Sequence, residues 1–167
     1  MPALEELIPF SARQLQTSHY TAEQIECAIG TVFGVDSQLI RDGTYWIALA
    51  KTDNRLVGCG GWSKRKTLDG SDRAKTAPDP LRDPATAPAM IRAFFVHPDY
   101  ARRGIGRRIM ELSEAGATVA GFRNIEIVAT PPGVPLYATF SYVSVERFEI
   151  ALTNGATMHV ERMRKAA

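Results

Sequence analysis

A glycine turn between an apolar run and a helical pattern constrains this chain more than any other feature. Residues 90–96 (MIRAFFV) are short and mostly apolar, which predicts a buried strand. Residues 97–99 (HPD) end the strand, because proline cannot continue a central ladder of hydrogen bonds. A helix is predicted from Ile105, with Gly121 as its stop. Its expected apolar face consists of Ile105, Ile109, Leu112, Gly116 and Val119.

The start of this helix has the features of a phosphate site. Gly104 and Gly106 allow the backbone to turn sharply and leave room beside it. The first turn of a helix has free backbone N–H groups and the positive end of the helix dipole, and both favour anions. Side-chain charge surrounds the turn, from Arg102, Arg103, Arg107 and Arg108. A diphosphate with a further phosphate nearby matches this charge better than a single carboxylate.

Size and charge narrow the classes of function. A chain of 167 residues is long enough for one domain with a sizeable core, so we expect a single domain over residues 1–167. The net charge is only +2 and no basic surface interleaved with aromatic residues is evident, so nucleic acid is not an expected partner. No apolar run reaches the roughly 18 residues of a membrane span, and the N-terminus has no signal pattern. We therefore expect no membrane partner and a cytoplasmic location.

The other segments predict an α/β fold of the α+β type. Helices are expected over residues 3–18, from Thr21 to about Gly30, over 36–40 and, as a short helix, over 134–141. Strands are expected over residues 45–50, 55–62, 124–130, 142–152 and 157–164. The strand–helix–strand unit 90–130 must supply a parallel pair within a largely antiparallel sheet. Gly58, Gly60 and Gly61 indicate that a ligand or another part of the chain approaches the second strand closely.

The stretch VHPDYARRGIGRRIM resembles the GNAT superfamily of acyl-CoA-dependent N-acetyltransferases. Gly104 and Gly106 match the family's turn pattern Gln/Arg-x-x-Gly-x-Gly/Ala, although Ala101 replaces its first residue. Residues 135–142 (PLYATFSY) are similar to the family's late segment, where Tyr137 falls at the position of a frequent tyrosine acid and Ser141-Tyr142 replaces Gly-Phe.

The resemblance covers roughly residues 45–165 and implies a GNAT-like domain, in which helices flank a mixed, mostly antiparallel central sheet. The family usually begins with a strand before its first helix. Residues 2–7 (PALEEL) already look helical, so we expect the first strand to be missing.

The resemblance also implies an activity, which is direct transfer of an acetyl group from acetyl-CoA (coenzyme A) to a primary amine of a small molecule or peptide. Backbone groups of Phe95 and Val96 would hold the pantetheine arm, and the Val96 N–H would face the thioester oxygen. Tyr137 would protonate the leaving thiolate. The diphosphate would lie on Arg102, Arg103, Gly104, Ile105, Gly106, Arg107 and Arg108. Dimers are common for the fold, so a homodimer is one expected assembly.

The general base has no obvious candidate, so the proton leaves through a water chain, goes to a carboxylate elsewhere, or is absent because the amine arrives neutral. Arg92 stands where many family members have a glutamate, and an arginine cannot act as a base near neutral pH. We favour a structural pairing of Arg92 with a carboxylate over contact with a substrate carboxylate. This departure and the short N-terminus leave a second function open, a non-catalytic acyl-CoA-binding or sensing domain.

Several other residues have a structural and a functional interpretation. Residues 63–66 (SKRK) are expected on a solvated face, with anion binding as the alternative. Tyr137 could be a core aromatic instead of the acid, and Tyr45, Trp46 and Trp62 could line an acceptor pocket or simply pack. Cys59 is expected to be a packed thiol and His97 a local hydrogen-bonding residue. No metal site is expected, because His19 and His159 have no partner cluster.

Overall fold

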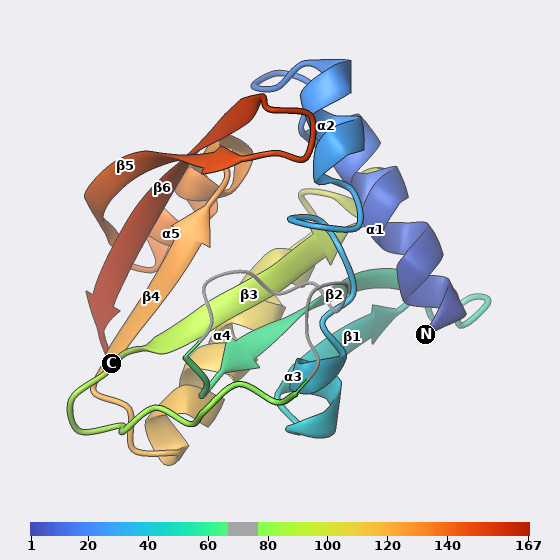
Figure 1. Ribbon diagram of the computed structural model, residues 1–167. Coiled ribbons are helices and arrows are strands. Elements are labelled where there is room, and N and C mark those ends of the chain that lie inside the picture. The colour runs from blue at the N-terminus through green and yellow to red at the C-terminus, as the bar shows by residue number, and fades with distance from the viewer. Residues whose placement is uncertain (67–76) are drawn as a thin grey trace.

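The computed structural model describes residues 1–66 and 77–167 and is built on one six-stranded sheet with the order β1-β2-β3-β4-β6-β5 (Figure 1). The strands are β1 (Tyr45–Leu49), β2 (Leu56–Ser63), β3 (Ala89–Val96), β4 (Asn124–Ala129), β5 (Val143–Ala151) and β6 (Thr157–Ala166). Only β3 and β4 run parallel, and every other neighbouring pair is antiparallel. The mixed, mostly antiparallel α/β fold is therefore as predicted.

Helices cover both faces of the sheet (Figure 1). On one face lie α1 (Pro2–Leu15) and α2 (Ala22–Ala28), whose apolar residues form one core cluster with Cys59 and Phe95. On the other face, α4 (Ile105–Val119) and α5 (Val134–Thr139) form a second cluster around Trp62 and Ile91. Short elements complete the chain: α3 (Ser37–Arg41), η2 (Pro98–Tyr100) and η3 (Pro131–Gly133).

The helix starts follow the sequence more closely than the helix ends. At the start of α2, the Gln24 N–H donates to Thr21 Oγ1 at 3.1 Å and the Thr21 N–H donates to Gln24 Oε1 at 2.8 Å, which is the predicted capping box. The first helix ends at Leu15, before the predicted end at residue 18. No strand precedes α1 within the described residues, as expected from the departure from the family pattern.

The buried face of α4 differs from the predicted one. Ile109 is buried as expected, but Val119 is 90% exposed. The residues that face the sheet are Ile109, Met110, Ser113 and Ala117. Gly116 of α4, a member of the predicted face, does pack against β2, because a Cβ atom there would lie 2.7 Å from Trp62 Nε1.

The glycines of β2 allow this close packing. A Cβ atom at Gly58 would lie 2.5 Å from Ile105 Cγ2, and one at Gly60 would lie 2.6 Å from Phe94 Cδ2. The predicted close approach is confirmed: side chains approach Gly58 and Gly60, and the backbone of Thr44 approaches Gly61. Ile105 is the first residue of α4, so the start of that helix is held directly against the sheet.

A strained residue, Ser141, follows the end of α5. Ser141 donates its N–H to the Ala138 carbonyl at 3.0 Å and has a φ of +67°, a conformation that favours glycine. We expect Ser141→Gly to raise the free energy of unfolding by about 1 kcal/mol. Urea denaturation measures this change. Ser144→Gly, on the exposed strand β5, is the control and should lower stability slightly. An equal decrease in the free energy of unfolding of both variants would contradict the prediction.

Candidate functional site

The parallel strands β3 and β4 part halfway along β3. Ala89, Met90 and Ile91 pair with β4, and the pairing ends there. The rest of β3 pairs only with β2, on its other side, through Arg92, Phe95 and Val96. Figure 1 shows the two strands diverging toward their C-terminal ends. The second half of β3 therefore presents an open edge toward β4, where an extended ligand can form backbone hydrogen bonds.

A β-bulge lies at the point of divergence. The register between β2 and β3 shifts between Cys59 and Gly61, and Ala93 has a φ of +57°. A bulge bends the strand that carries it and increases its local twist. Because Ala93 follows soon after the last pair with β4, the bulge directs the rest of β3 away from β4.

The predicted turn leads from β3 to α4 with a different division of roles between its glycines. Gly104 is the N-cap of α4 with a φ of +85°, and Arg102 also has a positive φ of +63°. Gly106 lies inside the helix and does not form the turn, so that part of the prediction is wrong. Its role is close packing, because a Cβ atom there would lie 3.1 Å from Leu136 Cδ2 on α5.

Free backbone N–H groups are present at this helix start. The Arg108 N–H donates to the Gly104 carbonyl at 3.0 Å, and no side chain caps the helix. The N–H groups that precede Arg108 in α4 have no acceptor within the helix. Together with the helix dipole they form an arrangement that suits a phosphate group.

The four arginines around the turn are exposed and differ in their contacts. Arg103 lies over the Tyr100 ring at 5.1 Å, and Arg107 lies over the Phe140 ring at 5.2 Å. Arg108 pairs with Glu111 at 3.2 Å. It is the only one of the four with an ion pair in the described part of the chain, so most of the positive charge at the turn stays available to a ligand.

Tyr137 lies beside the open edge of β3. Its ring packs edge-on against Phe94 of β3, with 6.5 Å between ring centroids, and against Tyr142 at 6.4 Å. The residue is buried, and burial raises the pKa of its hydroxyl above the ordinary value. The phenol is therefore protonated at neutral pH and can donate a hydrogen bond. The packing alone is compatible with both interpretations, a core aromatic and an acid.

Arg92 forms a buried ion pair. Its guanidinium contacts Asp36 at 2.9 Å, and the two side chains are 6% and 1% exposed. Asp36 also accepts the Leu39 N–H at the start of α3, at 3.3 Å. The structural pairing that we favoured for Arg92 is confirmed.

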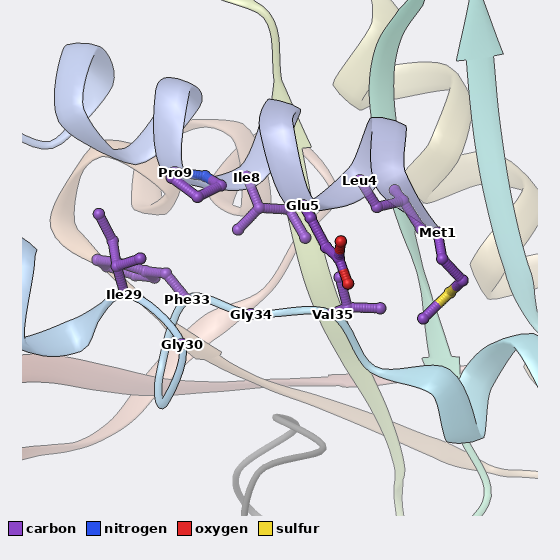
Figure 2. Close-up of a pocket in the computed structure, with 10 residues that line it drawn as sticks. All are labelled: Met1, Leu4, Glu5, Ile8, Pro9, Ile29, Gly30, Phe33, Gly34 and Val35. Atoms are coloured by element: carbon purple, nitrogen blue, oxygen red, sulfur yellow. The ribbon is translucent and has the colours of Figure 1, made fainter.

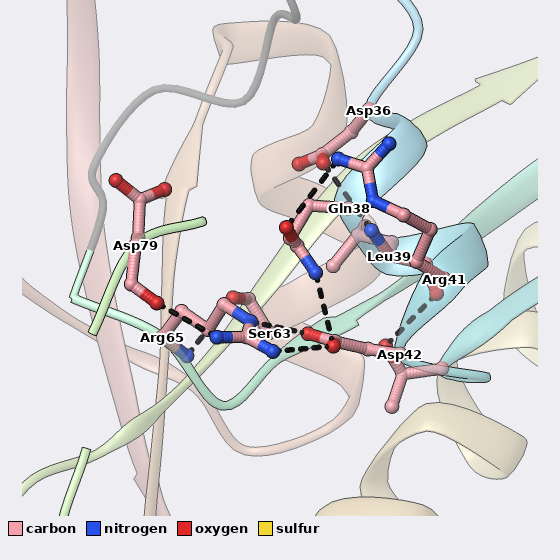
Figure 3. A network of polar contacts seen from close by, with 9 residues as sticks. Asp36, Gln38, Leu39, Arg41, Asp42, Ser63, Arg65 and Asp79 are labelled. Carbon is pink, nitrogen blue, oxygen red and sulfur yellow. Dashed lines mark hydrogen bonds and ion pairs between the residues drawn. The ribbon is translucent and has the colours of Figure 1, made fainter. Parts of the chain in front are cut away.

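The prediction for residues 63–66 is wrong for two of its members. Ser63 is buried at the end of β2, and the Arg65 side chain is only 17% exposed. Arg65 donates two hydrogen bonds of 2.7 Å to the Asp42 carboxylate and a third, of 2.8 Å, to the Asp79 carbonyl (Figure 3). The guanidinium is thus neither solvated nor free to bind an anion. It instead fastens the segment after β2 to the end of α3.

This contact makes stability depend on pH. Hydrogen bonds from Arg65 hold the pKa of Asp42 below its ordinary value of 3.8. A lowered pKa in the folded state means that the stabilisation is complete above about pH 5 and is lost as the pH falls through and below 3.8. We expect Asp42→Asn to lower the free energy of unfolding by about 1.5–3 kcal/mol at pH 7 and by much less near pH 3. Denaturant titrations of the wild type and the variant at both pH values measure this loss of stability. A loss of the same size at both pH values would contradict the prediction.

The other candidates take structural roles. His97 accepts the Asp99 N–H through Nδ1 at 3.2 Å, which confirms a local hydrogen-bonding role. Cys59 is fully buried, and burial raises the pKa of its thiol to about 11, so it is a packed thiol. Trp62 packs edge-on against Phe122 in the core. Within the described residues, no group of three or more His, Cys, Asp or Glu side chains could hold a metal ion.

A pocket of about 340 Å³ lies on the α1 side of the sheet (Figure 2). Its lining is mostly apolar: Met1, Leu4, Glu5, Ile8, Pro9, Ile29, Gly30, Phe33, Gly34 and Val35. None of the predicted site residues lines it. Phe33 connects the two regions, because it packs edge-on against Phe95 with 6.1 Å between ring centroids.

The sequence did not reveal the residues that support the site without belonging to it. Ala93 has no feature in the sequence that indicates a bulge, and Asp36 was predicted only as part of a helix. Phe94 contacts Tyr137 from β3, and the signal for it was Gly60, which leaves space for the Phe94 ring.

Comparison with known proteins shows the family of the chain. The model of the acetyltransferase (GNAT) family matches residues 4–142, which is most of the chain. The chain belongs to the GNAT acetyltransferase family. A search of curated protein sequences finds no match to this GNAT chain. None of its described helices is long and apolar enough to cross a membrane.

Solved GNAT structures share the fold at low sequence identity. A GCN5-related N-acetyltransferase from Rhodopseudomonas palustris aligns with a TM-score of 0.72 and 20% identity, over 99% of this chain and 89% of that chain. The PaiA N-acetyltransferase from Thermoplasma acidophilum, solved in complex with coenzyme A, aligns with a TM-score of 0.67 and 15% identity over 99% and 92%. A phosphinothricin acetyltransferase from Sinorhizobium meliloti, in complex with AcCoA, has a TM-score of 0.61 and 14% identity over 99% and 83%.

Proposed function

We propose that this GNAT chain is an N-acetyltransferase that transfers an acetyl group directly from acetyl-CoA to a primary amine of a small molecule or peptide. The observation that carries the proposal is the open second half of β3, which leads into the free N–H groups at the start of α4. An extended amide-rich arm followed by a diphosphate fits this order of backbone groups.

Each part of the site would have a separate task. Backbone groups of Phe95 and Val96 would bind the pantetheine arm as an added strand, and the turn 102–108 would bind the diphosphate. Acetyl-CoA supplies a thioester that can acylate an amine. The Val96 N–H would stabilise the negative charge that develops on the thioester oxygen. Tyr137 would donate a proton or hydrogen bond to the leaving sulfur.

The amine must lose a proton by a route that does not use Arg92. That arginine is held by Asp36 in a buried pair, so neither group is available as a simple base. We infer that the amine arrives neutral or loses its proton through water. The rate should then rise with pH toward the pKa of the acceptor amine, and a pH profile measured with two amines of different pKa tests this.

The direct test is release of free thiol from acetyl-CoA in the presence of a panel of primary amines and amine-bearing peptides. Amine-dependent thiol release supports the transferase. The second candidate is an acyl-CoA-binding or sensing domain. It is favoured by position 92, where this chain has an arginine instead of a glutamate. Tight coenzyme A binding without thiol release for any amine would support that candidate and contradict the transferase.

We further propose that residues 1–167 form one domain and that the protein acts in the cytoplasm, where acetyl-CoA is available to it. One sheet receives strands from residue 45 to residue 166, which supports a single domain. A homodimer is the proposed assembly, and sedimentation velocity at several concentrations tests it.

A further inference from the structure

The bulge in β3 places an alanine in a conformation that alanine disfavours. Ala93 has a φ of +57°, which is in the left-handed region. Such a residue persists only where its surroundings over-determine it. The groups that contact Ala93 and its neighbour Arg92 therefore decide whether the bulge keeps its shape.

Two side chains, one from β1 and one from β2, reach the Ala93 carbonyl. The Tyr45 hydroxyl, from β1, donates to it at 3.4 Å, and Cys59 Sγ, from β2, lies at 3.9 Å. A thiol is a weak donor, so the hydroxyl is the stronger of the two. Burial raises the pKa of Tyr45 above its ordinary value, and the hydroxyl therefore keeps its proton.

The register of the sheet explains how a side chain from β1 reaches β3. Tyr45 is directly opposite Gly61, and Gly61 is directly opposite Arg92. Residues directly opposite each other point to the same face of the sheet. A Cβ atom at Gly61 would lie 2.2 Å from the Thr44 carbonyl oxygen, so the lack of a side chain at Gly61 lets β1 pack closely on β2 beside the residue whose hydroxyl reaches the Ala93 carbonyl.

We propose that Tyr45 is a positioning residue, whose hydroxyl holds the Ala93 carbonyl and so fixes the bulge that parts β3 from β4. The consequence for catalysis rests on the proposed function. The bulge sets the direction of the following residues, so loss of the hydroxyl should misplace Phe95 and Val96 without removing any group that contacts the cofactor.

The variant Tyr45→Phe removes the hydroxyl and keeps the ring. Tyr20→Phe is its matched control, because Tyr20 is also buried and also donates to a backbone carbonyl, that of His159 at 2.6 Å. The Tyr20 contact lies at the β5–β6 hairpin, away from the bulge. A general loss of stability should appear in both variants, whereas a distorted bulge should appear only in Tyr45→Phe.

The first readout is hydrogen–deuterium exchange of the unliganded protein over residues 93–97. We expect roughly tenfold faster exchange in Tyr45→Phe, as for the loss of about one hydrogen bond, and no change there in Tyr20→Phe. Adding Ala93→Gly to Tyr45→Phe should restore much of the protection, since glycine adopts a positive φ without strain. Unchanged exchange in Tyr45→Phe would overturn the proposal.

The second readout is acetyl transfer with the best amine of the panel. We expect kcat to fall about tenfold in Tyr45→Phe, with the coenzyme A Kd changed less than about threefold, and kcat to recover with Ala93→Gly. Unchanged kcat alongside faster exchange would overturn the catalytic consequence. A protein that transfers acetyl to no amine would contradict the proposed function, and the exchange measurement would still decide the role of Tyr45.

Discussion

Replacing Tyr137 with phenylalanine is expected to lower kcat by about a hundredfold while leaving the coenzyme A Kd nearly unchanged, as for the loss of a general acid. The ring would keep its edge contacts with Phe94 and Tyr142, so only the hydroxyl is lost. Burial raises the pKa of that hydroxyl, which makes it a weaker acid than a free phenol. Hydrogen bonding to the departing sulfur should therefore account for much of the effect.

Tyr142→Phe is the matched control for this variant. Tyr142 is buried in the same cluster and packs against Tyr137, yet no role in the reaction is proposed for it. Steady-state kinetics with a saturating amine, together with calorimetric titration of coenzyme A, separate kcat from binding. If the two phenylalanine variants lose the same activity, Tyr137 acts as a core aromatic. If Tyr137→Phe keeps full kcat, it is not the acid.

Local patterns in the sequence were sufficient to predict the strand, turn and helix on which the proposed cofactor site is built. The apolar run before His97, the turn at Gly104 and the helix to Gly121 all form where they were expected. Strand alternation, capping residues and glycine turns act between neighbours in the chain, so they can be read without knowledge of the fold. The same holds for the capping box at Thr21.

Contacts between distant segments could not be predicted in the same way. Nothing near Arg92 in the sequence indicates that Asp36 neutralises it, and nothing near Arg65 indicates Asp42. The bulge at Ala93 depends on how β2 and β3 register, which is a property of the whole sheet. For α4, the periodic pattern correctly placed Gly116 against β2 but wrongly included Val119, which is 90% exposed.

The turn at Gly104 allows the strictest test of the cofactor site, because the chain contains a matched glycine elsewhere. Gly104 has a φ of +85° and Gly155, in the β5–β6 hairpin, has a φ of +83°; a Cβ atom would meet nothing within 4 Å at either position. Valine at either position is therefore strained by a similar amount, and both variants should lose similar stability.

Only one of these two variants should lose coenzyme A affinity. At Gly104, a distorted turn would misdirect the free N–H groups of the first turn of α4, and the new side chain would occupy the space proposed for the diphosphate. Losing about two charge-assisted hydrogen bonds corresponds to a Kd raised by roughly a hundredfold or more. Calorimetric titration of coenzyme A into Gly104→Val and Gly155→Val measures the difference. Equal affinities in the two variants would mean that the diphosphate is not bound at this turn, and would remove the assignment of the cofactor site.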